Sequence, residues 1–378
     1  MKQRSRGKLL ILLFAVVALF LAGCASSDSD GAQDDTENTA KGNEANGTGA
    51  TCQGKAGEAD TAEPLGAEGD ADGTGKKIGM VFDVGGKGDK SFNDSAFAGI
   101  TAAAENTGAE IKELEPSTDG SNREQLMRQL ADEDYDLIIG VGFAFAEVMP
   151  GIVADYPDTQ FAIVDSVLEA PNATSITFAQ HEGSFLVGAI AAQKTETGTI
   201  GFVGGVDTEL IKEFEAGYVA GAKAVDPDIN IDIKYISTGD DFSGFGDPTK
   251  GETIAKGLYD AGADVVYHAS GGSGEGVIKA AAEADRLVIG VDSNQYLSAT
   301  EDQQPCLLSS MLKRVDVGVY STIIDFLKGE EMGVVKTFDL ANDGIGYATQ
   351  GGQIEDTAAI DAFKQQIIEG EIEVPKVP

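Results

Sequence analysis

The sequence predicts an α/β protein of two lobes, each built on a parallel β-sheet that is flanked by helices. Short apolar runs alternate with amphipathic helical segments from Lys76 onward, and this alternation is typical of βαβ units. The alternation restarts near Thr199, so residues 76–378 hold two series of such units. Two successive lobes account for this length better than one very wide sheet.

The expected elements follow from the apolar runs. In the first series, strands are predicted near residues 78–82, 111–114, 137–141 and 161–165, with helices at about 93–106, 121–133 and 145–155. In the second series, strands are predicted near 199–203, 229–235, 264–267, 287–291 and 307–310, with helical segments between them. We expect lobe 1 to comprise about 76–180 plus 311–340, and lobe 2 to comprise about 181–310.

Small and acidic residues follow the predicted strands of both lobes. Open parallel sheets bind ligands beyond the carboxyl ends of their strands, and the residues at those places are Asp83, Gly142, Asp165, Gly204, Gly271 and Asp292. Each aspartate could instead cap the helix that follows it, but three aspartates after three strands favour a polar cleft. A ligand enclosed between two hinged lobes is the simplest arrangement.

The N-terminus has the parts of a secretory signal peptide. Four basic residues lie among the first eight, and an apolar run from Leu9 to Leu21 follows them. This run of about 13 residues is shorter than the ~20 that span a bilayer as a helix. The junction Leu21-Ala22-Gly23-Cys24 resembles a bacterial lipobox, which implies removal of residues 1–23 and lipidation of Cys24. We expect a lipid-anchored protein on the extracytoplasmic side of the cell membrane; a plain signal peptide or an uncleaved anchor is the alternative.

Charge separates a linker from the folded region. Residues 25–75 carry 12 acidic residues against Lys41 and Lys55 and almost no large apolar side chains. Such a composition predicts a flexible acidic linker, which we place at residues 24–75. Residues 76–378 hold 21 basic and 51 acidic residues. A surface this negative repels phosphate backbones, so we expect no nucleic-acid partner.

The cysteines and histidines offer little for covalent or metal chemistry. Cys24 is assigned to the lipid, Cys52 lies in the expected linker, and Cys306 lies in the folded region. A pair of cysteines in an exported protein can form a disulfide, but one partner here would lie in a segment without expected structure. We therefore expect no bridge and a small, buried Cys306. His181 and His268 are far apart in the sequence, and we expect neither a metal nor a cofactor.

Two glycine-rich stretches resemble nucleotide-binding loops but have the wrong spacing. Within residues 85–91, Lys87 is followed by Gly88, where a P-loop has Ser or Thr. The stretch from Gly272 to Gly276 places its third glycine one residue too early for a dinucleotide fingerprint. No serine lies near a histidine in a catalytic pattern, so the chain is not expected to be an enzyme.

A longer set of motifs matches a known family. The motifs run in order through residues 76–350 and include Asp83-Val84-Gly85-Gly86, Asp89-Lys90-Ser91-Phe92-Asn93-Asp94-Ser95-Ala96, Phe161-Ala162-Ile163-Val164-Asp165, Glu182-Gly183-Ser184-Phe185, Phe214-Glu215-Ala216-Gly217-Tyr218, Gly271-Gly272-Ser273-Gly274, Gly290-Val291-Asp292-Ser293-Asn294-Gln295 and Ser310-Met311-Leu312-Lys313. Together they resemble the basic membrane protein (BMP) family of purine nucleoside receptor-like lipoproteins. The resemblance implies a type I periplasmic-binding-protein fold, in which crossover hinge strands join the two lobes.

The resemblance also implies a function and a set of ligand-binding residues. The family captures nucleosides by lobe closure and delivers them to an ABC importer, whose permease and ATPase are separate subunits. By position in the motifs, Phe92 and Phe214 would sandwich the base, and Asn93 and Asp165 would bind its polar edge. The ribose would contact Asp83, Asp292 and Lys313, with the backbone around Gly272 close by.

Other functions remain open on the sequence alone. A receptor for a sugar or another small ligand is the nearest alternative, because fold does not fix the ligand. A nucleoside hydrolase would need metal-binding aspartates close together in the sequence, and these aspartates are scattered. A ligand sensor is a third possibility. Among nucleosides, adenosine, guanosine, inosine and the pyrimidine nucleosides all stay possible.

Overall fold

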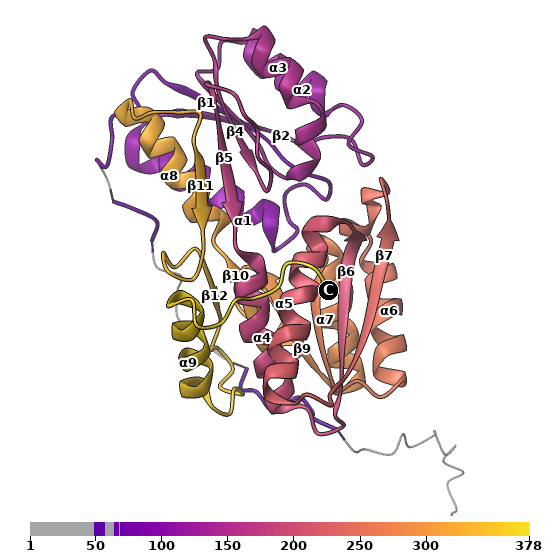
Figure 1. Cartoon of the computed structure of the whole chain (residues 1–378). Coiled ribbons are helices and arrows are strands. Elements are labelled where there is room, and N and C mark those ends of the chain that lie inside the picture. Colours follow the sequence, from indigo (N-terminus) through magenta and orange to yellow (C-terminus); the bar gives the residue numbers. More distant parts are fainter. Residues whose placement is uncertain (1–48, 57–63, 68) are drawn as a thin grey trace, which may run out of the picture. The chain divides into compact units, whose positions relative to one another are not determined.

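Two six-stranded sheets organise the described part of the chain (Figure 1). The computed structural model describes residues 49–56, 64–67 and 69–378; the predicted signal peptide, the lipobox and Cys24 lie outside these residues. Within them, no helix combines the length and the apolar character that crossing a membrane requires. The two sheets with their flanking helices confirm the predicted two-lobed α/β fold.

The sheet of lobe 1 is parallel throughout, in the order β11-β5-β4-β3-β1-β2. Its strands are β1 (Lys77–Val81), β2 (Glu110–Leu114), β3 (Leu137–Gly140), β4 (Gln160–Val164), β5 (Ala173–Phe178) and β11 (Val335–Phe338). Its helices are α1 (Phe92–Thr107), α2 (Arg123–Asp132), α3 (Met149–Asp155) and α8 (Val315–Lys328), with a 3-10 turn, η1 (Phe143–Glu147). Every residue of β3 is buried, which explains its continuous apolar run.

The sheet of lobe 2 has the order β12-β10-β9-β8-β6-β7, and β12 alone is antiparallel to its neighbour. Its strands are β6 (Thr199–Asp207), β7 (Asn230–Thr238), β8 (Val265–Ala269), β9 (Leu287–Asp292), β10 (Leu307–Lys313) and β12 (Ile345–Tyr347). Its helices are α4 (Gln180–Lys194), α5 (Glu209–Val225), α6 (Pro248–Asp260), α7 (Gly274–Ala284) and α9 (Thr357–Ile368), with 3-10 turns η2 (Phe242–Phe245), η3 (Gly271–Ser273) and η4 (Gln304–Cys306).

The chain passes between the two sheets three times within residues 69–378: from β5 into α4, from β10 into α8, and from β11 to β12. Residues 311–313 were expected in lobe 1, but they form the end of β10 in the second sheet. The side chain of Lys313, at the end of this strand, is buried. Residues after β11 return to lobe 2, where Phe363 of α9 contacts Phe185 of α4.

Close packing of α4 against α5 fixes the position of the helix that carries Phe214. A Cβ atom at Gly217 would lie 2.1 Å from the carbonyl oxygen of His181, and one at Gly221 would lie 1.8 Å from that of Phe185. Only glycine permits this approach of the two backbones. The middle of α5 is therefore held against the first two turns of α4, where the chain enters lobe 2.

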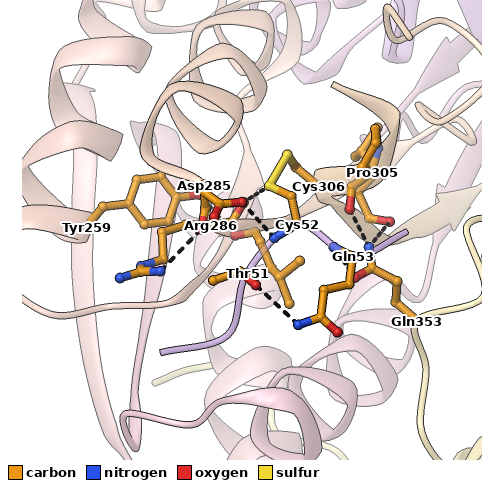
Figure 2. Close-up of a disulfide and its surroundings, with 11 residues drawn as sticks. Thr51, Cys52, Gln53, Tyr259, Asp285, Arg286, Pro305, Cys306 and Gln353 are labelled. Atoms are coloured by element: carbon orange, nitrogen blue, oxygen red, sulfur yellow. Dashed lines mark hydrogen bonds between the residues drawn. A yellow bond between two sulfur atoms is a disulfide. The ribbon is translucent and has the colours of Figure 1, made fainter. Parts of the chain in front are cut away.

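A disulfide between Cys52 and Cys306 attaches the segment before lobe 1 to lobe 2 (Figure 2). The amide of Ala50 donates to the buried carboxylate of Asp264 at 2.9 Å, and the amide of Gly54 donates to the Pro305 carbonyl at 3.0 Å. The expectation of two free cysteines is therefore wrong. Composition suggested an unstructured segment, but specific backbone hydrogen bonds dock it.

The same segment continues onto lobe 1. The side chain of Asn106 donates to the Leu65 carbonyl at 2.8 Å, and the Tyr320 hydroxyl donates to Asp70 at 2.7 Å. We call residues 49–56, 64–67 and 69–75 the N-terminal arm. The flexible linker predicted for residues 24–75 does not extend through the arm, because the arm is bonded to lobe 2 and then to lobe 1.

Candidate functional site

A cavity lies between the two lobes at the carboxyl ends of their strands. Its empty volume is about 530 Å³, including the part that opens to solvent. Seven of the eight predicted ligand-binding residues line it, namely Asp83, Phe92, Asn93, Asp165, Phe214, Asp292 and Lys313. Gly272 does not line it, although its neighbour Gly271 does.

Further lining residues had not been proposed as ligand-binding from the sequence. They are Val84, Asp89, Gly142, Phe143, Leu210, Ile211, Phe245, Gly271, Ala269 and Val291. Gly142 was recognised only as a residue that follows a strand, whereas the family resemblance had also placed the backbone of Gly271–Gly274 close to the ribose. Most of the apolar members come from turns and the starts of helices, and Ala269 and Val291 come from the ends of β8 and β9. At these places the sequence pattern does not distinguish an apolar side chain that lines a cavity from one in the core. Asp89 had a detectable signal, since it stands just before α1, where capping residues are common.

Two of the lining aspartates have an uncommon backbone conformation. Asp165 follows β4 with φ +64°, and Asp292 ends β9 with φ +63°. A left-handed conformation is unusual for residues other than glycine, although aspartate and asparagine tolerate it best. These two residues lie at the ends of strands in different lobes. At each of them the chain leaves its sheet and turns toward the cavity.

Asp83 is paired with a residue that sequence reasoning missed. The Arg123 guanidinium lies 3.1 Å from Asp83 Oδ1, which also accepts from the Val84 amide at 2.8 Å. Burial raises the pKa of Asp83, and the Arg123 charge partly offsets this rise. A Cβ atom at Gly142 would lie 2.0 Å from Asp83 Oδ2, so glycine is needed beside this carboxylate. Nothing in the pattern of α2 distinguished its first residue, Arg123, from a surface arginine.

Asn93 is held in one orientation by its neighbours. Its side-chain oxygen accepts from the Asp83 amide at 2.9 Å, and its side-chain nitrogen donates to Asp89 Oδ2 at 3.1 Å. Asp89 also accepts from the backbone amides of Ser91, Asn93 and Asp94 at the start of α1. Burial raises the pKa of Asp89 to about 6. With its oxygen engaged, Asn93 can offer the cavity an N–H donor.

Lys313 forms a buried ion pair surrounded by aromatic rings. Its Nζ lies 2.6 Å from Asp165 Oδ2, and the two side chains are 2% and 4% exposed. The same Nζ lies 5.2, 5.1 and 5.4 Å from the ring centroids of Phe92, Phe178 and Phe214, within the range of cation–π attraction. Asp165 Oδ1 is buried and has no hydrogen-bond partner among the described residues, so it can accept one.

Asp292 connects the two lobes. The Ser91 hydroxyl of lobe 1 donates to Asp292 Oδ2 of lobe 2 at 2.5 Å. Burial raises the pKa of Asp292 to about 6, although Lys313 and the bond from Ser91 oppose the rise. The described residues hold no group of three or more His, Cys, Asp or Glu side chains placed to bind a metal ion. The cavity therefore offers aromatic faces, carboxylates and one ammonium to an organic ligand.

The comparisons with known proteins agree with this architecture. Residues 76–377 match the model of a family described as Bmp, "ABC transporter substrate-binding protein PnrA-like". The ABC transporter nucleoside-binding protein BmpA of Lactococcus lactis is 36% identical over 334 residues, covering 81% of this chain and 92% of that protein. An uncharacterised lipoprotein of Pyrococcus furiosus is 31% identical over 313 residues, covering 76% of this chain and 77% of that protein.

A solved structure shows the same fold. The solute-binding protein of an ABC transporter system from Aeropyrum pernix has a TM-score of 0.68 and 27% sequence identity, covering 79% of this chain and 94% of that chain. Substrate-binding proteins bind a ligand and do not transform it, in agreement with the prediction that the chain is not an enzyme. The chain belongs to the Bmp family of PnrA-like ABC transporter substrate-binding proteins.

Proposed function

We propose that this protein captures nucleosides between its lobes, most readily purine nucleosides, and passes them to the permease and ATPase of an ABC importer. A lipid on Cys24 would hold it at the outer face of the cell membrane. The observation that supports the proposal most strongly is that Phe92 and Phe214 line the same cavity as four aspartates. The name of the Lactococcus lactis relative supports the same ligand class.

The base is assigned to the aromatic side of the cavity. Phe92 and Phe214 line it from different lobes, and rings stacked on an aromatic side chain gain about 0.5–1.5 kcal/mol beyond burial. The second N–H of Asn93 would donate to the base, and the unpartnered Asp165 Oδ1 would accept from it. A donor and an acceptor side by side suit the polar edge of a purine.

The ribose is assigned to the carboxylates Asp83 and Asp292. Hydroxyl groups that donate to carboxylates form charge-assisted bonds, which are stronger than bonds between neutral groups. Lys313 already donates to Asp165, and its ammonium has further N–H groups for a sugar oxygen. The backbone of the Gly271–Gly272 turn would complete this end of the site.

Calorimetry tests the proposal directly. The chain without residues 1–23, carrying Cys24→Ser, is freed of bound ligand by unfolding and refolding under conditions that re-form the disulfide. It is then titrated with purine and pyrimidine nucleosides, the free bases, ribose and common hexoses. Submicromolar binding of a nucleoside, with ribose inert, is the expected result. Binding of a hexose but of no nucleoside would refute the ligand class and leave the fold and family unchanged.

A further inference from the structure

We propose that Gln295 is a positioning residue that holds the two lobes closed without contacting the ligand. It lies in the loop after β9, is 1% exposed, and is absent from the residues that line the cavity. Its side-chain nitrogen donates to the carbonyl oxygen of Lys90 in lobe 1 at 3.3 Å. The proposal rests on ligand binding between the lobes, as set out above.

The orientation of the Gln295 amide is fixed by its own lobe. Its Oε1 accepts from the Val291 amide at 3.0 Å and lies 2.9 Å from His268 Nε2. A backbone N–H can only donate, so the atom facing Val291 must be the oxygen. His268 Nε2 must then carry a proton and donate as well. The N–H groups of Gln295 are left to point toward Lys90.

His268 is locked in the form that this arrangement requires. The Ser270 hydroxyl lies 3.2 Å from its Nδ1, which accepts that proton when Nε2 carries the ring hydrogen. A Cβ atom at Gly274 would lie 2.0 Å from the imidazole Cε1, so the ring is tightly enclosed. Burial lowers the pKa of His268 to about 4, and the imidazole stays neutral at physiological pH.

The partner of Gln295 in lobe 1 is also held in an uncommon conformation. Lys90 has φ +52°, and its carbonyl faces lobe 2. Beside it, the Ser293 hydroxyl donates to the Ser91 carbonyl at 3.2 Å. The nearby Lys90–Glu275 ion pair is 3.4 Å long and its side chains are 45% and 40% exposed, so water and salt weaken it. The hydrogen bond from Gln295 is part-buried, so it is better shielded from water and salt than this ion pair.

A latch of this kind changes affinity for every ligand equally. If only the closed form binds tightly, the apparent dissociation constant is the intrinsic constant divided by the closed fraction. Loss of one hydrogen bond between the lobes should therefore raise the apparent dissociation constant roughly three- to tenfold. Residues that contact the ligand should instead alter the ranking of ligands.

Gln295→Glu, measured at alkaline pH so that the buried carboxyl is ionised, tests the latch, because a carboxylate still accepts from Val291 and His268 but cannot donate to the Lys90 carbonyl. The matched control is Ser298→Ala, which removes a bond from Ser298 to the Gln295 carbonyl within the same loop. Affinities of both variants are measured by calorimetry for three ligands that the unaltered protein binds. Small-angle scattering without ligand reports the degree of lobe opening.

Gln295→Glu should weaken the binding of all three ligands by the same factor and increase the radius of gyration of the ligand-free protein. Ser298→Ala should change neither the affinities nor the radius of gyration. Ser293→Ala removes the neighbouring interlobe bond and should act in the same direction if Gln295→Glu fails to fold. The proposal that Gln295 holds the lobes closed would be overturned by unchanged affinity and size, or by losses of affinity that differ between ligands. The scattering result does not depend on ligand identity, so binding of a sugar would refute the nucleoside proposal alone.

Discussion

Lys313 Nζ lies 2.6 Å from Asp165 Oδ2 in a site where both side chains are almost fully buried. Lys313→Met removes the cation and leaves a buried carboxylate without its partner. We expect the free energy of unfolding to fall by about 3–5 kcal/mol, measured by chemical denaturation. The double variant Lys313→Met/Asp165→Asn should recover most of this loss. A double variant as unstable as the single one would show that the pairing is not the cause.

Phe92→Ala and Phe214→Ala should each weaken nucleoside binding at least about tenfold, because each removes one face of the proposed stack. Calorimetry measures the affinity, and thermal unfolding confirms that the variants fold. Phe363→Ala is a suitable control, since Phe363 packs on Phe185 and does not line the cavity. Full affinity in both cavity variants would eliminate the stacking role.

Asp292→Asn should separate the sugar from the base. The amide introduced by this substitution would keep an acceptor for the Ser91 hydroxyl but lose the charge that strengthens bonds from ribose hydroxyls. We expect ribonucleosides to lose more affinity than the corresponding free bases in parallel titrations. Equal losses for nucleoside and base would place the ribose away from Asp292.

The same substitution should change how stability depends on pH. Because burial raises the pKa of Asp292 from 3.8 to about 6, the ligand-free folded protein binds more protons than the unfolded chain between these values. Asp292 therefore costs stability as pH rises through about 6. As pH rises from 4 to 7, the free energy of unfolding of Asp292→Asn should increase by on the order of 1–3 kcal/mol relative to that of the unaltered protein. If the difference in the free energy of unfolding between the two proteins does not change with pH, the raised pKa of Asp292 is contradicted.

Removal of the disulfide should lower stability without lowering affinity. Cys52 and Cys306 are 254 positions apart, so the bond greatly restricts the unfolded chain. Cys52→Ser/Cys306→Ser should cost about 2–5 kcal/mol in thermal or chemical unfolding. Reduction of the unaltered protein should reproduce the shift. Neither cysteine lines the cavity, and a large loss of ligand affinity would mean that the arm influences closure.

Local pattern predicted the fold and placed three aspartates of the candidate site at the ends of strands. Buried strands such as β3 and β9 appear as continuous apolar runs, and the residues that follow them meet at one edge of each sheet. Family motifs then identified Phe92, Phe214 and Lys313, whose side chains otherwise resemble core or surface residues.

Contacts between distant segments left no such pattern. The Arg123–Asp83 pair depends on how α2 packs, and the Gln295 latch depends on how the lobes close. The disulfide could not be predicted because Cys52 lies in a segment of low hydrophobicity. That segment is ordered by hydrogen bonds such as the one from the Ala50 amide to Asp264. Nearly every residue type has a backbone amide, so the sequence does not show which amides will form such bonds.

The bond between Cys52 and Cys306 also makes the chain a closed ring between these two residues. A protease that cuts once anywhere inside this ring produces two fragments that remain covalently joined. Under the proposed lipid attachment, such a nick would not release the binding lobes from the cell surface. Shedding would require a second cut, reduction of the disulfide, or cleavage in the short stretch between Cys24 and Cys52.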